Sequence, residues 1–323
     1  TSAALGRARA LAAELPDRQN ASMAGGEAEM ATWWYDNDAL LREARVEYGP
    51  LHAPLYSLQQ HEAYFIQPEL RAAVASLEAA AAGGGAVNES AVRSLLQPTG
   101  VPGVWRLPIF TPLFCRLLID ELRHYEESGI PLRRPNGMNR FGAILDQLGL
   151  EDSMTYLSRR YLRPLGQLLF PWLISDGDAD EHYAFAVRYK LGEDVALAEH
   201  ADASVLTLNA NLGLPASEGG FTGGAVAFKG TRFIDERPQE MPAHEVDFAS
   251  MEPGDGVLHL GGQYHAALPI DSGERVNMIV WLHGKYEVVR VAPYAELEQL
   301  SAQQRWSAYA RENADSLMMG ARA

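Results

Sequence analysis

Two histidines and one aspartate in the second half of the chain carry the side chains best suited to hold a metal ion. His200 and Asp202 form a His-x-Asp pair, and His265 follows 63 positions after Asp202. Such a pair alone is weak evidence, because chance supplies about 0.4 of them in a chain with nine histidines and sixteen aspartates. This pair, however, precedes an alternating strand pattern, and His265 lies in a turn-rich stretch before the last strand. The three residues are therefore predicted to bind one divalent metal ion.

Two imidazoles and one carboxylate on one face of a metal are typical of non-haem Fe(II) oxygenases. Such a set leaves three adjacent coordination positions open, enough for a bidentate 2-oxo acid and one molecule of O₂. Arg275, ten residues after His265, offers a planar guanidinium that can hold the far carboxylate of that acid through two hydrogen bonds. The alternative for each residue is an ordinary structural role, as a surface histidine, a strand cap or an edge-strand arginine.

The sequence around these residues resembles the Fe(II)/2-oxoglutarate dioxygenases. The resembling stretches are FAVRYKLGEDVALAEHADASVLTLNANL (185–212), FTGGAVAFKG (221–230) and GDGVLHLGGQYHAALPIDSGERVNMIVWL (254–282). Among these dioxygenases, the stretches resemble the lysyl hydroxylase catalytic domain and the family called 2-oxoglutarate and iron-dependent oxygenase domain-containing protein 2. The second resemblance extends upstream through LPIFTPLFCRLLIDELRHYEES (107–128) and RPNGMNRFGAILDQLGLE (134–151). More than half of the chain is covered.

The resemblance implies a double-stranded β-helix (jelly-roll) core with the metal at its open end. It implies that His200, Asp202 and His265 bind Fe(II), and that Arg275 holds the C5 carboxylate of 2-oxoglutarate. The implied cofactors are Fe(II), the cosubstrate 2-oxoglutarate and O₂, with ascorbate as an optional addition.

Three further residues near the site each allow two interpretations. Tyr189 and Asn209 match strand positions that line the cosubstrate pocket of the lysyl hydroxylases, and core packing is the alternative for Tyr189. An amide in a strand is costly to bury without partners, which favours pocket lining for Asn209. His259 lies in an apolar strand six residues before His265, and we interpret it as a hydrogen-bonded core histidine rather than a fourth ligand.

The elements that must position these residues change character along the chain. Apolar stripes predict a helix that begins at Thr111-Pro112 and ends at Gly129, and a second helix after Ser153 that is bent or broken near Pro164. Short strand-like runs follow at 185–189, 205–210, 225–228, 256–260 and 277–282. Helices followed by many short strands predict an α+β fold, with helices packed outside a β-sandwich or small barrel. A Rossmann arrangement would need strand and helix to alternate.

Composition divides the chain into three regions. Residues 1–100 are Ala-rich with helical periodicity, and the stretches 20–27 and 79–88 are expected to be flexible loops. Residues 101–290 are expected to form the Fe(II)/2-oxoglutarate dioxygenase catalytic domain. Residues 291–323 are expected to form a helical C-terminal extension.

Charge and cysteine content exclude several classes of protein. Forty-two acidic residues against 27 basic ones give a net charge of −15, and no basic run occurs, so a nucleic-acid partner is not expected. No stretch approaches the roughly 20 apolar residues of a membrane span. The single cysteine, Cys115, excludes an internal disulfide and a Cys-rich zinc site. We expect an intracellular protein, cytoplasmic or nuclear, with an already removed targeting segment as the alternative. The sequence predicts no oligomeric state.

The predicted function is hydroxylation of an unactivated C–H bond by an Fe(II)- and 2-oxoglutarate-dependent dioxygenase. The substrate is expected to be a protein or peptide side chain, with lysyl residues first, or a small molecule. An acidic chain would attract a cationic substrate, although solubility is an alternative reason for the acidity. The acidic residues before the strand that leads to the metal are Asp176, Asp178, Asp180 and Glu181.

Two segments are expected to shape substrate access, residues 134–142 and the charged connection 231–252. Two other functions stay open. One is a metal-binding jelly roll without oxygenase activity, which would have no need of Arg275. The other is a regulatory scaffold with a dioxygenase fold.

Overall fold

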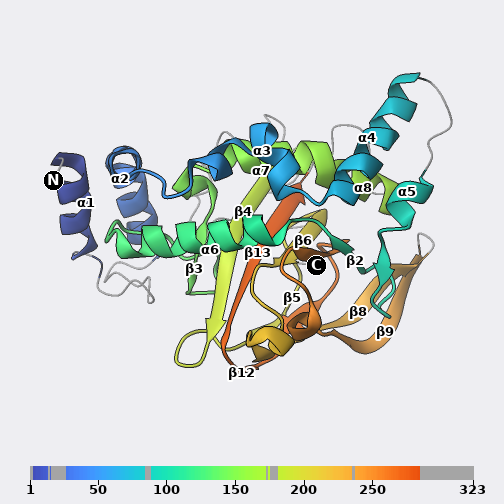
Figure 1. Ribbon diagram of the computed structural model, residues 1–323. Coiled ribbons are helices and arrows are strands. Elements are labelled where there is room, and N and C mark those ends of the chain that lie inside the picture. The colour runs from blue at the N-terminus through green and yellow to red at the C-terminus, as the bar shows by residue number, and fades with distance from the viewer. Residues whose placement is uncertain are drawn as a thin grey trace.

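Helices with a few short strands among them occupy the chain up to residue 169, and most strands follow from residue 181, in the order that the sequence predicts (Figure 1). The computed structural model describes residues 3–13, 15, 27–83, 89–171, 174, 181–234 and 237–283. The α-helices are α1 (Ala3–Ala12), α2 (Glu27–Tyr48), α3 (Leu58–Phe65), α4 (Pro68–Gly83), α5 (Ser90–Arg93), α6 (Pro112–Glu127), α7 (Glu151–Leu157) and α8 (Arg163–Leu169). The strands are β1 (Gln97–Pro98), β2 (Trp105–Pro108), β3 (Gly142–Ile144), β4 (Glu181–Lys190), β5 (Leu197–His200), β6 (Leu206–Asn211), β7 (Thr222–Gly223), β8 (Val226–Ile234), β9 (Arg237–Val246), β10 (Asp255–Leu260), β11 (His265–Ala267), β12 (Ile270–Ser272) and β13 (Glu274–His283).

The strands form two main antiparallel sheets with a core between them. The larger sheet has seven strands in the order β1-β2-β10-β6-β13-β4-β3, and the smaller has four in the order β5-β11-β8-β9. The short strands β12 and β7 pair with each other. Aromatic and aliphatic side chains from both sheets, such as Phe185 and Phe228, fill the space between them. The α+β fold with a double-stranded β-helix core is therefore as predicted.

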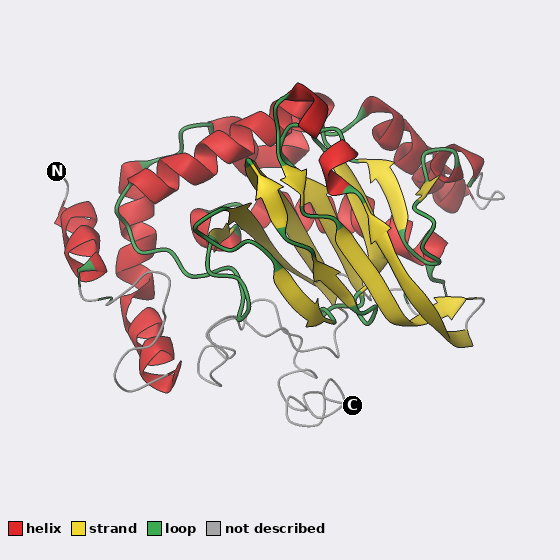
Figure 2. Cartoon of the chain, turned by 90° about the horizontal axis from the view of Figure 1, so that it is seen from below, coloured by secondary structure: helices red, strands yellow, loops and turns green. Residues whose placement is uncertain are grey.

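Strand β13 explains how the larger sheet is covered on both of its faces. Successive side chains of a strand point to opposite faces. The even-numbered residues belong to a core shared with helices α3, α4, α6, α7 and α8; they are Val276, Met278, Val280 and Leu282. Figure 2 shows these helices along one side of the strands. The odd-numbered residues face the smaller sheet; they are Arg275, Asn277, Ile279 and Trp281. Polar side chains are thereby buried between the sheets.

The two predicted helices of the middle region are confirmed. Thr111 caps α6, because its hydroxyl accepts a hydrogen bond from the backbone N–H of Phe114 at 3.3 Å. Helix α7, a π-helical turn (Ser158–Leu162) and α8 follow one another, with Pro164 in the first turn of α8, so this helix is irregular where the proline predicts it. Among the described helices, none combines the length and the apolar character of a membrane span.

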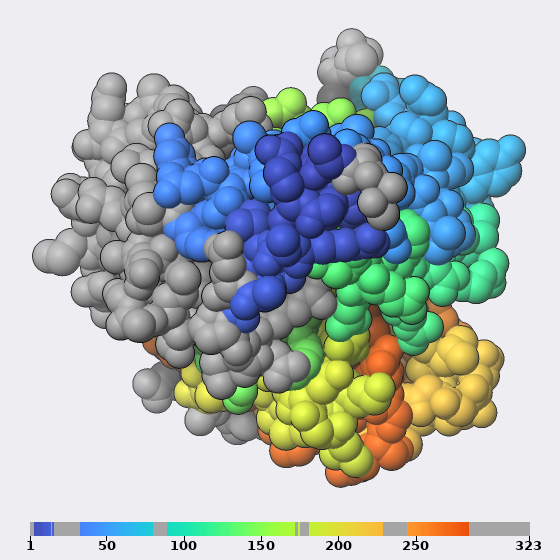
Figure 3. Space-filling model, turned by 90° about the vertical axis from the view of Figure 1, so that its left-hand side faces the viewer, coloured from blue at the N-terminus to red at the C-terminus, as the bar shows by residue number. Residues whose placement is uncertain are grey.

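The first hundred residues contribute to two separate cores. Helices α3 and α4 pack on the larger sheet through side chains such as Phe65 and Val74. Helix α1 packs on α2 in a cluster of its own that includes Ala8 and Leu41, and Figure 3 shows α1 (dark blue) on the surface of the molecule. Helix α4 continues to Gly83, so the first half of the loop expected at 79–88 is helical.

The division into three regions stays a prediction. Residues 20–26, 84–88 and 291–323 lie outside the described part of the chain.

The expectation of a connection at 231–252 is wrong. Residues 231–234 complete β8 and residues 237–246 form β9, and the two strands pair from Val226 opposite Val246 to Ile234 opposite Arg237. Strand β9 lies at the edge of the smaller sheet. Charged residues and proline are tolerated at a sheet edge, and their presence here hid the strand in the sequence.

Glu121 on α6 joins the N-terminal region to the core through a buried carboxylate. It accepts hydrogen bonds from the backbone N–H groups of Leu51 at 3.0 Å and His52 at 2.7 Å, and from the hydroxyl of Tyr56 at 2.9 Å. Glu121→Ala would leave these donors without an acceptor, so we expect the free energy of unfolding to fall by about 3 kcal/mol in a urea titration. Glu121→Gln keeps one acceptor oxygen, so its free energy of unfolding should fall by less. Wild-type stability of Glu121→Ala would contradict this role.

Candidate metal centre

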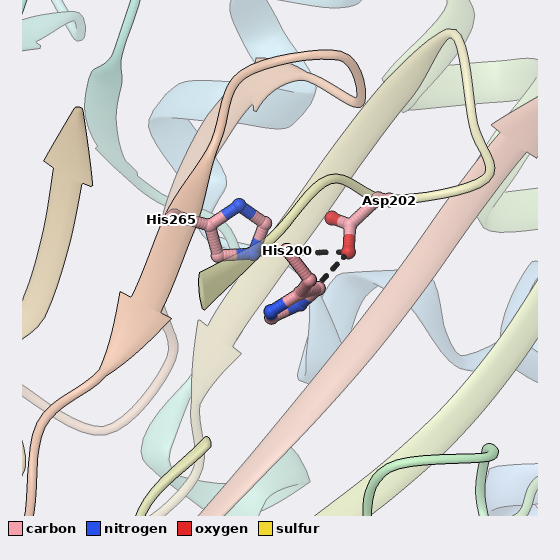
Figure 4. Close-up of side chains that lie close together, drawn as sticks. All are labelled: His200, Asp202 and His265. Carbon is pink, nitrogen blue, oxygen red and sulfur yellow. Dashed lines mark ion pairs between the residues drawn. The ribbon is translucent and has the colours of Figure 1, made fainter. Parts of the chain in front are cut away.

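Strands β5 and β11 bring the two predicted histidine ligands side by side. His200 ends β5, His265 begins β11, and the two residues are directly opposite each other in this antiparallel pair. Asp202 lies two residues after β5, and its carboxylate is turned toward both imidazoles (Figure 4). One ligand atom of each residue lies within 4.8 Å of the other two. The three predicted ligands therefore form one cluster.

Hydrogen bonds to the backbone determine which nitrogen of each histidine faces Asp202. Nδ1 of His200 lies 2.8 Å from the carbonyl oxygen of Ala198, and Nδ1 of His265 lies 2.9 Å from that of Gln263. Because a carbonyl oxygen only accepts, each Nδ1 carries a proton, so in the neutral imidazole Nε2 is the atom with the free lone pair. The two Nε2 atoms lie 3.4 and 3.7 Å from Oδ1 of Asp202. Metal-binding histidines are commonly oriented in this way.

The charges of the three residues suit a cation between them. Burial raises the pKa of Asp202, but the three neighbouring histidines outweigh this effect and hold the pKa of the carboxyl well below its usual range. Burial lowers the pKa of His265. Burial also lowers the pKa of His200, but the hydrogen bond and charge of Asp202 outweigh it and leave this pKa raised. An ionised carboxylate beside imidazole nitrogens is a donor set that fits a divalent metal.

Asp202 is also held from its other side, by a threonine whose role the sequence did not indicate. The hydroxyl of Thr207 donates to Oδ2 of Asp202 at 2.7 Å, and lies 2.8 Å from the hydroxyl of Ser204. A carboxylate only accepts, so Thr207 donates to Asp202 and receives its own hydrogen bond from Ser204. Oδ1 of Asp202 therefore stays turned toward the two histidines.

Thr207→Val removes this hydroxyl and keeps the shape of the side chain. We expect the affinity for Fe(II) to fall by about tenfold or more, because partners that orient metal ligands are typically worth that much. An anaerobic competition titration against a chelator measures it. Thr207→Ser retains the hydroxyl and should bind the metal like the wild type. If the valine variant also bound Fe(II) with wild-type affinity, the role given to Thr207 would be wrong.

His259 lies beside the three ligands but outside their set. Its Nδ1 lies 2.8 Å from the carbonyl oxygen of Leu260. Its Nε2 lies 3.9 Å from Oδ2 of Asp202, which is the oxygen bound by Thr207 and not the one that faces the other histidines. Burial and the neighbouring His265 lower the pKa of His259 to about 4. This agrees with its interpretation as a neutral core histidine.

Arg275 is a buried cation in the same pocket. It is 2% exposed, its Nε donates to Oδ1 of Asn277 at 2.9 Å, and its Nη1 donates to the carbonyl oxygen of Gly224. The ring of Phe248 lies 4.5 Å from the guanidinium. Burial lowers the pKa of Arg275 to about 10, so the group is still charged at neutral pH. No carboxylate of the described residues pairs with it, and a buried charge without a partner is costly. This end of the pocket is suited to an anion.

Tyr189 and Asn209 both line this pocket next to Arg275. Tyr189 is opposite Arg275 in the pairing of β4 with β13, and its ring lies 5.4 Å from the guanidinium. Its hydroxyl accepts a hydrogen bond from Asn139 at 3.2 Å. Asn209 accepts from the amide of Asn277, which in turn accepts from Arg275. Tyr189 therefore contacts Arg275 directly, and Asn209 acts through Asn277.

One pocket is lined by all six predicted site residues and by further side chains that the sequence did not identify as part of the site. The further lining residues are Asn136, Asn139, Phe185, Val187, Leu197, Thr207, Val226, Ala267, Ile279 and Trp281. Asn136 and Asn139 belong to residues 134–142, so this segment borders the pocket. Of the acidic residues expected near the site, Asp176, Asp178 and Asp180 lie outside the described part of the chain.

Comparison with protein families gives a match over the helical part of the chain. The family model described as the OGFOD2-like domain matches residues 45–174. This range includes helices α3 to α8 and residues 134–142, and it ends before the strands that carry the candidate ligands.

Individual relatives cover those strands as well. A protein of Mus musculus called 2-oxoglutarate and iron-dependent oxygenase domain-containing protein 2 is 36% identical over 261 residues, which are 79% of this chain and 69% of the relative. Its namesake in Xenopus tropicalis is 38% identical over 245 residues, which are 75% of this chain and 64% of the relative. The chain thus spans slightly less than two thirds of the Xenopus protein.

Two more distant matches are an enzyme and a solved structure. Procollagen-lysine,2-oxoglutarate 5-dioxygenase 1 of Rattus norvegicus is 29% identical over 199 residues, which are 58% of this chain and 25% of the enzyme. The non-heme alpha ketoglutarate dependent epimerase SnoN from nogalamycin biosynthesis is 18% identical with a TM-score of 0.44, and the match covers 65% of this chain and 89% of SnoN.

Proposed function

The chain belongs to the family of 2-oxoglutarate and iron-dependent oxygenase domain-containing protein 2, and from this premise we propose that it is a dioxygenase that hydroxylates an unactivated C–H bond. One oxygen atom of O₂ would enter the substrate as a hydroxyl group. The other would enter succinate, which forms from 2-oxoglutarate with loss of CO₂. Bound Fe(II) supplies the oxidising chemistry, and the chain binds, orients and shields the reactants.

The proposed iron ligands are Nε2 of His200, Oδ1 of Asp202 and Nε2 of His265. Their support is the convergence of these three atoms, while the remaining polar atoms of the same side chains are engaged in hydrogen bonds. Three ligands of this kind leave room at the metal for a bidentate 2-oxo acid and for O₂.

The observation that carries the proposal is the buried guanidinium of Arg275 in the same pocket as the three ligands. A dicarboxylate with a 2-oxo group would bind the metal with one end and would supply the missing anion to Arg275 with the other. A metal-binding jelly roll without oxygenase activity would have no use for this arginine. A scaffold with a degenerate site would have no reason to keep the complete set.

The proposed cosubstrate site includes the polar neighbours of Arg275. Tyr189 packs against the guanidinium and offers a hydroxyl to the same carboxylate. Asn209 orients Asn277, which fixes Nε of Arg275, and the carbonyl oxygen of Gly224 holds Nη1, so Nη2 would be directed to the ligand. The aromatic side chains Phe185 and Trp281 line the pocket and would exclude water from the reacting atoms.

Succinate release tests the proposal. Protein supplied with Fe(II), 2-oxoglutarate, ascorbate and a peptide library should form succinate. No succinate should form when iron or 2-oxoglutarate is left out. In cells, a substrate heavier by one oxygen atom should appear with the wild type and not with His200→Ala. Succinate formation that continues without iron, or identical products in both cell lines, would contradict it.

For the substrate we propose a lysyl side chain of a protein or peptide. Its support is the similarity to an enzyme named for procollagen lysine and the net charge of −15, which favours cationic partners. Three peptides that differ only in Lys, Arg or Gln at one position separate the possibilities. We expect the Lys peptide to stimulate succinate release several-fold over the Gln peptide. Stimulation by neutral small molecules or nucleic acid alone would reject the lysyl substrate and leave the oxygenase proposal intact.

A further inference from the structure

An irregular segment outside the jelly roll, residues 134–139, forms part of the pocket wall. We call it the asparagine loop. Its two asparagines, Asn136 and Asn139, are 6% and 1% exposed, although they lie in neither a helix nor a strand. The loop is fixed by its own residues, because Nε of Arg134 donates to the carbonyl oxygen of Asn136 at 2.9 Å. It is also fixed by the sheet, because the hydroxyl of Tyr183 donates to the carbonyl oxygen of Pro135 at 2.7 Å.

The hydrogen bonds of the asparagine loop determine the orientation of both amide side chains. Oδ1 of Asn136 accepts from the backbone N–H groups of Met138 at 2.8 Å and Asn139 at 2.7 Å, so the other atom of this amide must be the donor Nδ2. This Nδ2 donates to Oδ1 of Asn139 at 3.0 Å. The remaining atom of Asn139 is therefore Nδ2, which donates to the hydroxyl oxygen of Tyr189 at 3.2 Å.

These hydrogen bonds determine the hydrogen-bonding role of the Tyr189 hydroxyl in the pocket. Its hydroxyl oxygen is an acceptor toward Asn139, so its own proton must point elsewhere. Within the described part of the chain this proton has no acceptor, although Tyr189 is only 4% exposed. Burial raises the pKa of the phenol, which keeps the proton in place at neutral pH. Because Tyr189 lies against Arg275, its proton is available to an anion bound there.

We propose that Asn139 is a positioning residue for the cosubstrate: it holds the Tyr189 hydroxyl as a hydrogen-bond donor to the distal carboxylate of 2-oxoglutarate. This inference rests on the proposed function, and it adds a contribution from outside the jelly-roll strands. The OGFOD2-like domain, residues 45–174, would thereby complete the cosubstrate site of the downstream strands. The alternative is that the hydrogen bond from the Asn139 side chain to Tyr189 only anchors the asparagine loop.

A double-mutant cycle separates these two roles. The dissociation constant of 2-oxoglutarate is measured by calorimetry on Mn(II)-loaded protein for the wild type, Asn139→Ala, Tyr189→Phe and the double variant. We expect each single variant to weaken binding on the order of five- to tenfold, as the loss of one hydrogen bond does. In the Tyr189→Phe background, Asn139→Ala should have no further effect, because the proton that it orients is gone.

Two more variants sharpen the test. Asn139→Asp has nearly the same shape, but its carboxylate can only accept hydrogen bonds, so it should draw the Tyr189 proton away from the pocket. It should weaken the binding of 2-oxoglutarate at least as much as Asn139→Ala does. Met138→Ala changes an exposed side chain of the same loop and should leave the dissociation constant unchanged. Thermal unfolding of each variant reports whether the loop change alters the fold.

The outcomes distinguish this inference from the proposed function. Equal weakening by Asn139→Ala in both backgrounds, or none in either, overturns the positioning role while 2-oxoglutarate still binds. Failure of the metal-loaded wild type to bind 2-oxoglutarate overturns both proposals. An effect of Asn139→Ala that vanishes in Tyr189→Phe supports the inference.

Discussion

His200→Ala is expected to abolish both Fe(II) binding and succinate formation and to leave the fold intact. The variant removes one of three ligands, and the two that remain cannot hold the ion at the concentrations of an ordinary assay. The side chain of His200 is 16% exposed at the end of a strand, so its loss removes little packing. Iron content after anaerobic gel filtration and far-UV circular dichroism measure the two parts of this prediction.

Two further variants control this experiment. Asp202→Asn keeps the size of the side chain and removes the charge between the histidines, and it should lose iron in the same way. His61→Ala alters a partly buried histidine of helix α3 that forms a hydrogen bond with Ser57, outside the pocket that holds the three ligands, and it should keep full iron content. Full iron occupancy with normal succinate release in His200→Ala or Asp202→Asn would rule out the proposed ligand set.

Arg275→Met is expected to retain iron and to lose affinity for 2-oxoglutarate. Truncating one partner of a buried guanidinium–carboxylate pair costs about 2–5 kcal/mol, which is a factor of roughly 30 or more in the dissociation constant. The ligand would then be held by the metal alone. The same titration on Arg123→Met, an exposed arginine that pairs with Glu274, should give the wild-type constant. An unchanged constant for Arg275→Met would show that the guanidinium does not bind the cosubstrate.

The metal ligands could be predicted from their residue types and order, because a His-x-Asp pair before a strand pattern, followed by His265 and Arg275, is a specific combination. The two strands that bring them together, β5 and β11, were not predicted, and their antiparallel pairing is what places His200 opposite His265. Most of strand β13 was predicted, as the run 277–282, because this stretch is almost wholly apolar and follows a turn.

The contacts that support these residues could not be predicted, because they join positions whose spacing carries no pattern. The hydrogen bond between Asn139 and Tyr189 links the irregular asparagine loop to a residue of strand β4 that is 50 positions away in the sequence. The bond between Thr207 and Asp202 depends on the turn after β5, whose conformation no periodicity describes. In both cases the sequence does not indicate which residue the polar side chain forms a hydrogen bond with, because only the fold brings the two residues together.

The most direct test of the proposed site is an anaerobic titration of 2-oxoglutarate into the Fe(II)-loaded chain, followed by visible absorption. A 2-oxo acid that binds Fe(II) through its carboxylate and keto oxygens absorbs visible light by charge transfer from the metal, and an acid bound elsewhere on the protein does not. We predict a band that saturates at one 2-oxoglutarate per chain, that is absent in His200→Ala, and that needs far more ligand in Arg275→Met. Bound Fe(II) without any such band at saturating 2-oxoglutarate would contradict the shared site of iron and cosubstrate.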